Sequence, residues 1–504
     1  MSSVRKKVIL VVLSLLIVGW GVMLGIQKRT PHQAPAIAAP TSSPSASSSA
    51  SSSASGAASA GPSGSPSSAP SGTATASPSA DPDGGAPKLM DRPLRVTALG
   101  WDIAAPGLLA NGGADPAPKS DFSAAGIEVH IAPVDGVPAL EAALARGGED
   151  KDGADIAILP LPTFVASYER LRALSLDMFF VTGWSRGHDA IVGAKAEWPT
   201  KGEVKLAATA GTPSAFVAMW AFDLQGIAPS QIKLVAPSEA ASAAPFAAVD
   251  RSSGAPRDST RSALLLTTAD APRLVPYVAV APRGLLETRS KALTAWASTW
   301  LAGARKLAQD APAGARTVSS AKGAPEPIAL LQTLGQSTPA TLADNVRVVG
   351  LSGRSAVTLE RLFQRSWALW RAASILATPP PDAAPVSTGV ISALARAEPG
   401  QAAGVDDDKP RDVGASAKTL ITYRQADGKL DETALIETAG VLAGVFERAP
   451  LRLAIATGAS IDKARTKKAI DDATGRFGLA PGRLVPATKP VPQTAASIEI
   501  LTAP

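Results

Sequence analysis

The stretch VKLAATAGTPSAFVAMWAFDLQGIAPSQIKLV, Val204–Val235, decides the fold because it indicates a strand, a polar turn, a helix and a second strand. Its first six residues, Val204–Thr209, indicate a short strand. Thr212 then supplies a hydroxyl directly before Pro213, which is the order typical of a helix N-cap followed by a first-turn proline. The spacing of Phe216, Trp220 and later apolar residues predicts an amphipathic helix that begins at this turn.

The start of this helix is also a candidate ligand site. First-turn N–H groups have no partner within a helix and carry a partial positive charge. Together with the hydroxyls of Thr212 and Ser214, they could hold an anion or a small polar molecule. An ordinary strand-to-helix connection with a well-made cap is the alternative. Gly226 followed by Pro229 predicts where the helix ends.

Composition limits the possible classes of protein. The 504 residues are 45% hydrophobic and 4% aromatic, which is enough for two or three domains. The formal charge is +6, and five basic residues around one apolar run near the N-terminus contribute +5 of it. Nucleic-acid binding therefore lacks electrostatic support. Three histidines and no cysteine give no metal-ligand spacing, so we expect no metal and no cofactor.

The apolar run Val8–Ile26 has 19 residues without a charge. As a helix it measures roughly 29 Å, which matches the hydrocarbon core of a bilayer. Lys28 and Arg29 follow it directly, so we expect an uncleaved anchor, with cleavage at a later small-residue site as the alternative. The basic residues before it predict a cytoplasmic tail at 1–7 and a single-pass inner-membrane protein whose bulk lies in the periplasm.

Composition divides the rest of the chain. Residues 27–90 are mainly Ser, Ala, Pro, Gly and Thr, which predicts a disordered linker. Alternating strand and helix patterns predict an α/β region over 91–378. Residues 379–417 indicate a second linker, interrupted by a short helix near Val390–Arg396, and a last domain follows at 418–504.

The α/β region contains many predicted elements. Its expected strands are Leu94–Leu99, Ile127–Ile131, Ile156–Leu159, Met178–Val181, Ala190–Ala194, Val204–Thr209, Lys233–Val235, Ala263–Leu266 and Tyr277–Ala281. Its expected helices are Pro138–Arg146, Pro162–Leu171, Ser214–Leu224, Leu293–Ala308 and Leu359–Ala373.

This region resembles the periplasmic substrate-binding proteins of the nitrate, sulfonate, taurine and thiamine-precursor type. The resemblance rests on the order and spacing of Gly100-Trp101-Asp102, ADIAILPLPTF (Ala154–Phe164), VTGWSRGHDAIVGA (Val181–Ala194), the GTPSAF turn, VPYVAVAPRGLLE (Val275–Glu287), NVRVVGL (Asn345–Leu351) and LFQRSWALWRAAS (Leu362–Ser374). It implies the two-lobed type II binding-protein fold, of the α/β class. In that fold, residues 188–194 cross from lobe one to lobe two, and residues 275–281 cross back.

The resemblance also implies a ligand between the lobes, at the carboxyl ends of strands. The residues it places around that ligand are Trp101, Asp102, Thr163, Trp184, Thr212, Ser214, Thr268 and Asp270. Core positions for the two tryptophans and helix caps for the two aspartates are the alternatives. Relatives often carry a Trp-Glu-Pro segment in lobe two, and FAAVDRSSGAP (Phe246–Pro256) lacks it, so the class of ligand stays open.

Residues 418–504 resemble an OmpA-like module, a small α+β domain that holds peptidoglycan in its family. The segments that follow its order are Leu420–Tyr423, Glu432–Arg448, Leu451–Ile455, Asp462–Leu484 and Ser497–Leu501. Arg465 falls where the family's arginine grips the diaminopimelate carboxylate. The family's Thr-Asp is missing from Ala456–Ala459, so we expect at most a weak peptidoglycan contact and favour a structural or docking role.

One catalytic pattern needs consideration. Gly183-Trp184-Ser185-Arg186-Gly187 matches G-x-S-x-G, the nucleophile elbow of α/β-hydrolases. The elbow requires a helix after the serine and a histidine further along the chain. Here a strand-like segment follows and no histidine occurs after His188, so we expect no enzymatic activity.

The apolar run predicts a membrane-anchored protein, and the resemblance implies an extracytoplasmic solute-binding protein that captures a small anionic or polar solute by hinge closure. An ABC permease is the candidate partner, beside a weak peptidoglycan contact and the membrane contact of residues 8–26. The alternative is a non-transport envelope protein, structural or sensory, whose cleft and peptidoglycan site have degenerated.

Overall fold

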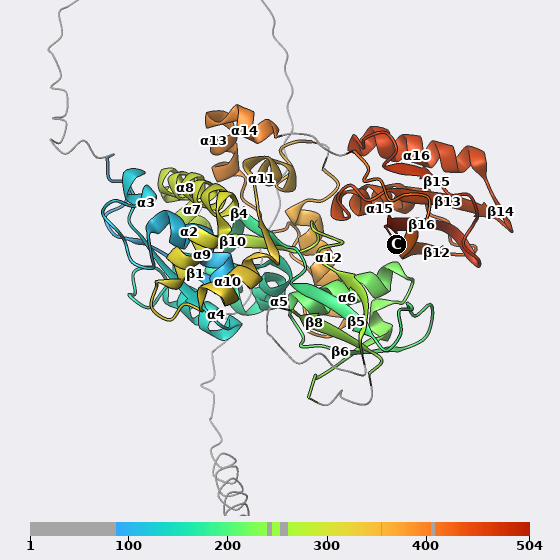
Figure 1. Cartoon of the computed structure of the whole chain (residues 1–504), viewed down its shortest axis with the longest axis horizontal. Helices are drawn as coiled ribbons and strands as arrows, with labels where there is room; N and C mark the ends of the chain where they lie inside the picture. The colour runs from blue at the N-terminus through green and yellow to red at the C-terminus, as the bar shows by residue number, and fades with distance from the viewer. Residues whose placement is uncertain (1–86, 239–243, 252–260, 354, 405–408, 504) are drawn as a thin grey trace, which may run out of the picture. The chain divides into compact units, whose positions relative to one another are not determined.

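The computed structural model describes residues 87–238, 244–251, 261–353, 355–404 and 409–503 (Figure 1). The predicted anchor Val8–Ile26 and the predicted linker up to residue 86 lie outside these ranges. Across the ranges described, no helix is both long and apolar enough to span a bilayer. The anchor stays a prediction from the sequence.

Six strands form the first sheet, in the spatial order β11-β4-β10-β3-β1-β2. Strand β1 pairs in parallel with β2 and β3, whereas β10 runs antiparallel to β3 and β4. Every residue of β3 and β4 is buried, as expected for strands that are covered on both faces. The strands are β1 (Leu94–Leu99), β2 (Val129–Val134), β3 (Ile156–Pro160), β4 (Leu176–Ser185), β10 (Pro276–Pro282) and β11 (Ser337–Pro339).

Five strands form the second sheet, in the spatial order β7-β6-β8-β5-β9. Strand β6 pairs in parallel with β7 and β8, and β5 runs antiparallel to β8 and β9. The strands are β5 (Asp189–Gly193), β6 (Val204–Ala207), β7 (Ile232–Val235), β8 (Phe246–Asp250) and β9 (Ala263–Thr267).

Each sheet contains one antiparallel strand that the chain enters from the other sheet. Strand β4 of the first sheet leads into β5 of the second, and β9 of the second leads back into β10 of the first. The two predicted changes of lobe occur, but the crossing segments are residues 186–188, between β4 and β5, and 268–275, between β9 and β10. The predicted ranges 188–194 and 275–281 are mostly the strands β5 and β10 that follow the crossings. Apart from the extra strand β11, the two sheets have the same topology, in which β2-β1-β3-β10-β4 corresponds to β7-β6-β8-β5-β9. We call the two α/β units built on these sheets lobe one and lobe two.

Helices cover both sheets, and several begin at a side-chain cap. Thr212, Asp310, Thr341 and Thr358 each accept a hydrogen bond from an amide of the first turn of the helix that follows. The helices of the two lobes are α2 (Trp101–Asn111), α3 (Asp121–Ala124), α4 (Val137–Arg146), α5 (Leu161–Leu171), α6 (Pro213–Leu224), α7 (Arg283–Thr288), α8 (Ser290–Gln309), α9 (Ala311–Ser319), α10 (Pro327–Leu334), α11 (Leu342–Val348), α12 (Leu359–Ala372), α13 (Gly389–Ala397) and α14 (Pro399–Ala403).

Aromatic side chains fill the core of lobe one between α8 and the first sheet. Trp296 and Trp300 of α8 are fully buried, with ring centroids 5.0 Å apart. Trp296 also contacts Phe179 and Phe180 of β4, each at 5.8 Å between centroids. Helix α2 crosses α8 so closely that Gly107 lies directly against the Trp300 ring. This packing fixes α2, which carries two of the predicted site residues.

Helix α6 differs from the amphipathic helix that the sequence predicts. Nearly all of its residues are buried, because the sheet of lobe two, α12 and the C-terminal domain all pack against it. Trp220 lies 5.7 Å from Phe446 of the C-terminal domain, and Phe216 lies 6.2 Å from Trp370 of α12, between centroids. The predicted end of the helix is confirmed, since Gly226 follows it with a φ of 86°.

The first part of the predicted second linker carries ordered structure. Helix α13 confirms the short helix expected there, and it buries Val390, Ile391 and Leu394 in the core of lobe one. The backbone around Val386 also bonds to Met178 of β4. This segment therefore packs on lobe one over its described residues.

The C-terminal domain contains strand, helix, strand, helix and two strands in that order, with a short extra strand. The elements are β12 (Lys418–Ala426), α15 (Glu432–Val445), β13 (Leu451–Thr457), β14 (Ser460–Ile461), α16 (Lys463–Phe477), β15 (Leu484–Pro486) and β16 (Thr494–Thr502). Strand β16 lies between β12 and β13, and β15 pairs with β13. The predicted elements are present in the predicted order, and the resemblance to an OmpA-like module stays a prediction.

Candidate ligand site

A buried hydroxyl network joins the two crossings between the lobes. Oγ1 of Thr268 lies 2.7 Å from Oγ of Ser185 and accepts a hydrogen bond from the amide of Gly187 at 2.8 Å. The Ser185 hydroxyl donates to Oδ2 of Asp189 at 2.7 Å. Thr268 and Ser185 are fully buried. Thr268, a predicted ligand residue, therefore ties the crossings together and has no surface to offer a ligand.

The same network includes Ser185, the serine of the G-x-S-x-G pattern. Ser185 is buried and hydrogen-bonded to Asp189, and the strand β5 follows it where a nucleophile elbow needs a helix. The pattern therefore forms part of a lobe crossing.

His188 lies among carboxylates at the first crossing. Its Nδ1 is 3.4 Å from Oδ1 of Asp250 and 3.8 Å from Oδ1 of Asp189. Burial disfavours the charged ring, but Asp189, Asp250 and Asp102 outweigh burial and raise the pKa of His188 to about 9. At neutral pH this histidine is protonated, so it offsets the negative charge of the carboxylates around it.

Asp102 stands at the carboxyl end of β1, in the first turn of α2. Its Oδ2 atom is buried and has no hydrogen-bond partner among the residues described. Burial raises the pKa of this carboxyl group above its usual range, although His188 acts in the opposite direction. An acceptor in this state is uncommon, because most buried polar atoms in folded proteins have a partner.

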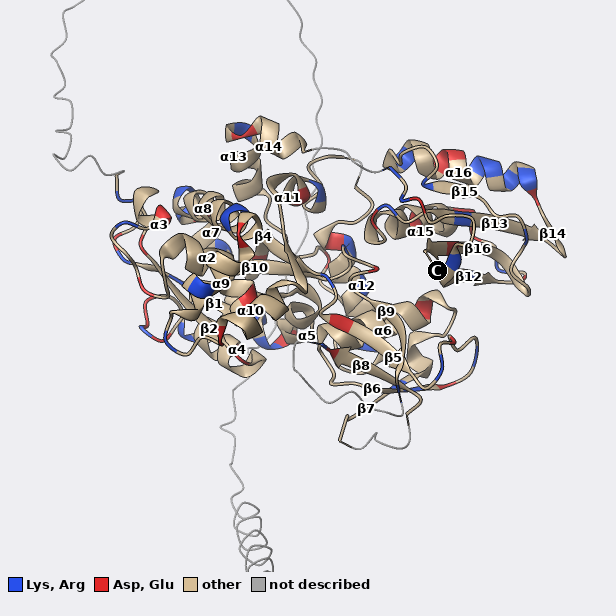
Figure 2. Ribbon diagram, in the orientation of Figure 1, with Lys and Arg blue, Asp and Glu red and all other residues tan. Residues whose placement is uncertain are grey.

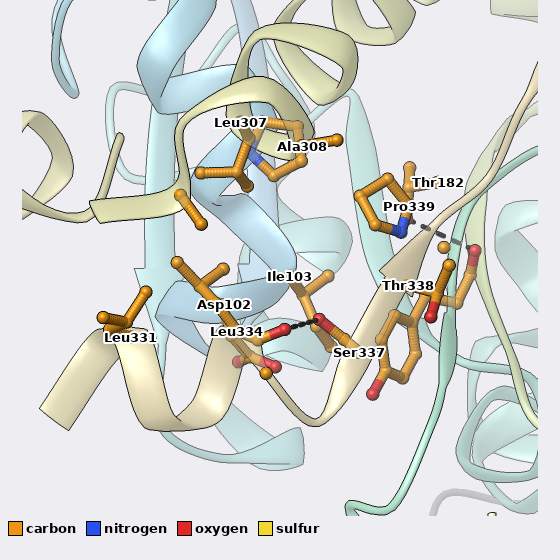
Figure 3. A pocket seen from close by; sticks show the side chains of 15 residues that line it. Asp102, Ile103, Thr182, Leu307, Ala308, Leu331, Leu334, Ser337, Thr338 and Pro339 are labelled. Carbon is orange, nitrogen blue, oxygen red and sulfur yellow. Dashed lines mark hydrogen bonds between the residues drawn. The ribbon is translucent and has the colours of Figure 1, made fainter. Parts of the chain in front are cut away.

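Asp102 lines a cavity of about 220 Å³ within lobe one, next to the crossing strands (Figure 3). Tyr277 of β10 and Thr182 of β4 contribute a phenol ring and a hydroxyl, and Leu307 and Leu331 belong to the mainly apolar remainder of the wall. Burial raises the pKa of Tyr277 well above its ordinary value, so the phenol stays neutral. None of the 15 described lining residues is a lysine or an arginine.

The two predicted tryptophans occupy core-like positions. Trp184 is 2% exposed, and the guanidinium of Arg273 covers its ring. Trp101 is partly buried and packs against the core of lobe one. Asp270 caps a turn, because its Oδ2 accepts hydrogen bonds from the amide and the hydroxyl of Thr267, both at 2.9 Å. The two tryptophans fit the core positions that the sequence left open as the alternative, whereas Asp270 caps a turn and no helix.

The turn before α6 lies against lobe one. Thr163 of α5 donates its hydroxyl to the carbonyl of Gly211 at 3.2 Å. Oγ1 of Thr212 accepts from the amide of Ala215 at 3.4 Å and donates to a carbonyl of the preceding turn at 2.7 Å. Ser214 is 5% exposed, and its hydroxyl is 3.3 Å from that of Thr212. The cap hydroxyl is thus satisfied internally, and the anion site predicted here gains no support from the geometry.

Arg465 lies in α16 and is paired within the C-terminal domain. Its Nε donates to Oε1 of Glu432, in the first turn of α15, at 2.7 Å. A peptidoglycan carboxylate would therefore compete with Glu432 for this guanidinium.

Of the eight predicted ligand residues, only Asp102 lines the cavity. Thr163, Thr212 and Ser214 gather at the contact between the lobes, about the turn before α6. Sequence reasoning did not single out Tyr277. Its phenol within an otherwise apolar strand was the one local signal that could have marked it.

No family model matches the chain, and no curated protein matches it. Solved structures with some likeness include the ligand-binding component of an ABC-type import system from Staphylococcus aureus with zinc bound (12% identity, TM-score 0.40, 60% of this chain and 98% of that one). A second is the alkanesulfonate-binding protein SsuA from Xanthomonas axonopodis pv. citri bound to MOPS, with 15% identity and a TM-score of 0.38 over 56% of this chain and 94% of that one. A third is the periplasmic nitrate-binding protein NrtA from Synechocystis PCC 6803, with 14% identity and a TM-score of 0.35 over 58% of this chain and 91% of that one. At these identities and scores the likeness assigns neither a family nor a ligand.

Proposed function

We propose that this protein binds a small solute in the lobe-one cavity beside the crossings. The observation that carries the proposal is the buried Oδ2 of Asp102, which faces no hydrogen-bond donor among the described residues. Leaving a buried acceptor unpaired costs about 1–3 kcal/mol, and a donor on a ligand would remove that cost. The cavity of about 220 Å³ is below the roughly 300–1,000 Å³ of sites for drug-sized ligands, which favours a small molecule.

The lining of the cavity favours a neutral or cationic solute over an anion. Among the described lining residues the one carboxyl group is that of Asp102, none is a lysine or an arginine, and the walls are mainly apolar. A carboxylate or sulfonate would meet no countercharge there. The proposed ligand is therefore a small, largely apolar molecule with an amine or hydroxyl that donates to Asp102, which narrows the sequence-based expectation of an anionic or polar solute.

The position of the cavity suits a hinge mechanism. Thr182 and Tyr277 lie on β4 and β10, the two strands of the first sheet that continue across to lobe two. A ligand that contacts these strands would bias the angle between the lobes. In this proposal the predicted anchor Val8–Ile26 holds the protein at the inner membrane, with its bulk in the periplasm, and the loaded form docks on an ABC permease.

A thermal-shift titration of the full-length chain tests the proposal. Small primary amines and amino alcohols should raise the melting temperature, whereas nitrate and small sulfonates should not. Asp102→Asn should remove most of the shift, because the amide has one accepting oxygen in place of two, cannot ionise to pair with an amine, and presents an NH2 donor of its own. Asp382→Asn makes the same chemical change at an exposed position and should keep the shift. Equal shifts for both variants, or no amine that shifts the wild type, would refute the site.

The runner-up is a sensory or structural envelope protein without transport. It is favoured by the contacts of Arg273 at the second crossing, which reach Asp344 of lobe one and Glu447 of the C-terminal domain at 3.1 Å each. In this alternative the binding cleft and the peptidoglycan site have degenerated, and the contacts of Arg273 serve to hold the lobes and the C-terminal domain together. Equal peptidoglycan sedimentation by the wild type and Arg465→Ala is expected for this alternative, whereas sedimentation that depends on Arg465 would contradict it.

A further inference from the structure

The sheet of the C-terminal domain has an inner face, which packs on the core of that domain, and an outer face on the opposite side. Ile498 and Leu453, paired in register, are fully buried on the core face, and helices α15 and α16 pack on the sheet. Residues directly opposite one another in a sheet point to the same side, and neighbours along a strand point to opposite sides. Thr422, Glu499 and Arg452 are paired in register across β12, β16 and β13, so they form one row on the outer face.

A groove of about 510 Å³ follows this outer face. The row just described lines it, together with Arg424, which is two residues beyond Thr422 on the same strand and the same face. Its wall is the segment TKPVP, residues 488–492, which leads into β16. The hydroxyl of Thr494 donates to the carbonyl of Val491 at 2.7 Å and pins this wall. The two prolines stiffen it further.

The charge in the groove is mainly positive. Arg424, Arg452 and Lys489 face one carboxylate, that of Glu499, which leaves a net charge of +2 among the lining residues. The Nε atom of Arg424 is buried and has no hydrogen-bond partner within the described part of the chain. Burial lowers the pKa of this guanidinium, so its surroundings supply too little negative charge to compensate it.

We propose that this groove binds an oxyanion, the phosphate or carboxylate group of a ligand, through Arg424 and Arg452. A guanidinium matches the planar fork of such a group and holds it by two parallel hydrogen bonds. The ligand would give the buried Nε the acceptor it lacks, and the hydroxyls of Thr422 and Thr488 could bond further oxygens. This site uses other residues than the lobe-one cavity, in another domain, so neither proposal depends on the other.

The test is a titration of inorganic phosphate with the full-length chain, followed by the ³¹P NMR line width. The wild type should broaden the line saturably. Arg452→Gln should weaken binding by at least about tenfold, the loss expected for a charge-assisted hydrogen bond. Lys467→Gln removes one positive charge from α16, where basic residues also gather (Figure 2), and should leave binding unchanged. No saturable broadening, or equal binding by Arg452→Gln and Lys467→Gln, would overturn the proposal.

A second variant separates ligand binding from folding. Arg424→Met removes the unpaired buried donor, so the melting temperature of the unliganded chain should not fall, while phosphate binding is lost. A lower melting temperature with phosphate binding retained would assign Arg424 a structural role and contradict the proposal. Vesicles of phosphatidylglycerol, compared with phosphatidylcholine, distinguish the sources of the oxyanion. Competition by the anionic vesicles identifies a lipid headgroup, and its absence identifies a soluble anion.

Discussion

The guanidinium of Arg273 lies over the indole ring of Trp184, 5.1 Å from the ring centroid. The two residues belong to the two crossings between the lobes, Trp184 at the end of β4 and Arg273 just before β10. The same guanidinium pairs with Asp344 and with Glu447 of the C-terminal domain. One side chain therefore links both crossings, lobe one and the C-terminal domain.

We expect Arg273→Met to destabilise the protein by on the order of 3 kcal/mol, because the largely buried carboxylate of Asp344 would lose its cationic partner and keep only its hydrogen bonds from Thr341. Chemical denaturation of the full-length chain measures the effect. Arg172→Met, at an exposed position, is the matched control and should change stability by less than about 0.5 kcal/mol. A change in Arg273→Met as small as that expected of the control, less than about 0.5 kcal/mol, would mean that the contacts of Arg273 contribute no stability.

Stability should fall as the pH rises from about 6.5 to about 9. The pKa of His188 is raised in the folded protein to about 9, from 6.5, so its contribution is fully present below 6.5 and is lost as the pH passes the folded value. The shift corresponds to roughly 3 kcal/mol. Urea denaturation at several pH values should show this slope in the wild type and a flatter curve in His188→Gln. An unchanged slope in the variant would assign it to other groups.

Gly107→Ala should destabilise the protein by about 1–3 kcal/mol, although alanine is the better helix former. A Cβ atom there would lie 2.1 Å from the ring of the buried Trp300, so α2 and α8 would have to separate. Gly284→Ala in α7 provides the control, because its Cβ would meet nothing within 4 Å. That variant should be neutral or more stable by up to about 1 kcal/mol. Thermal melts compare the two, and equal melting temperatures would contradict the close helix crossing.

Local patterns predicted most strands and several helices, because periodicity and caps are properties of neighbouring residues. Strand β1 and helix α5 appear close to where they were expected. Helix α2 was not predicted. Eight of its residues, from Ile103 to Asn111, are buried, so the sequence shows no apolar stripe that would mark a helix, and Pro106 within it argues against one.

The candidate site was much less predictable than the fold. Asp102 could be selected because it follows the first strand, but its lack of a partner depends on what α10 and the crossing strands bring near it. Thr212 shows the opposite case. From the sequence alone its hydroxyl was as good a candidate for ligand binding as the carboxyl of Asp102. In the structure that hydroxyl bonds to an amide of the helix it caps and to a carbonyl of the preceding turn.

The sequence by itself determined the alternation of strands and helices and the order of elements in the last domain, since these follow from spacing along the chain. The two crossings were expected only from the resemblance to a family. Only the tertiary structure decided that the cavity lies within lobe one, that Trp184 is covered by Arg273, and that α6 is buried on nearly all sides. The physical reason is that burial and hydrogen-bond satisfaction are sums over contacts between residues distant in the chain, and no local pattern contains those partners.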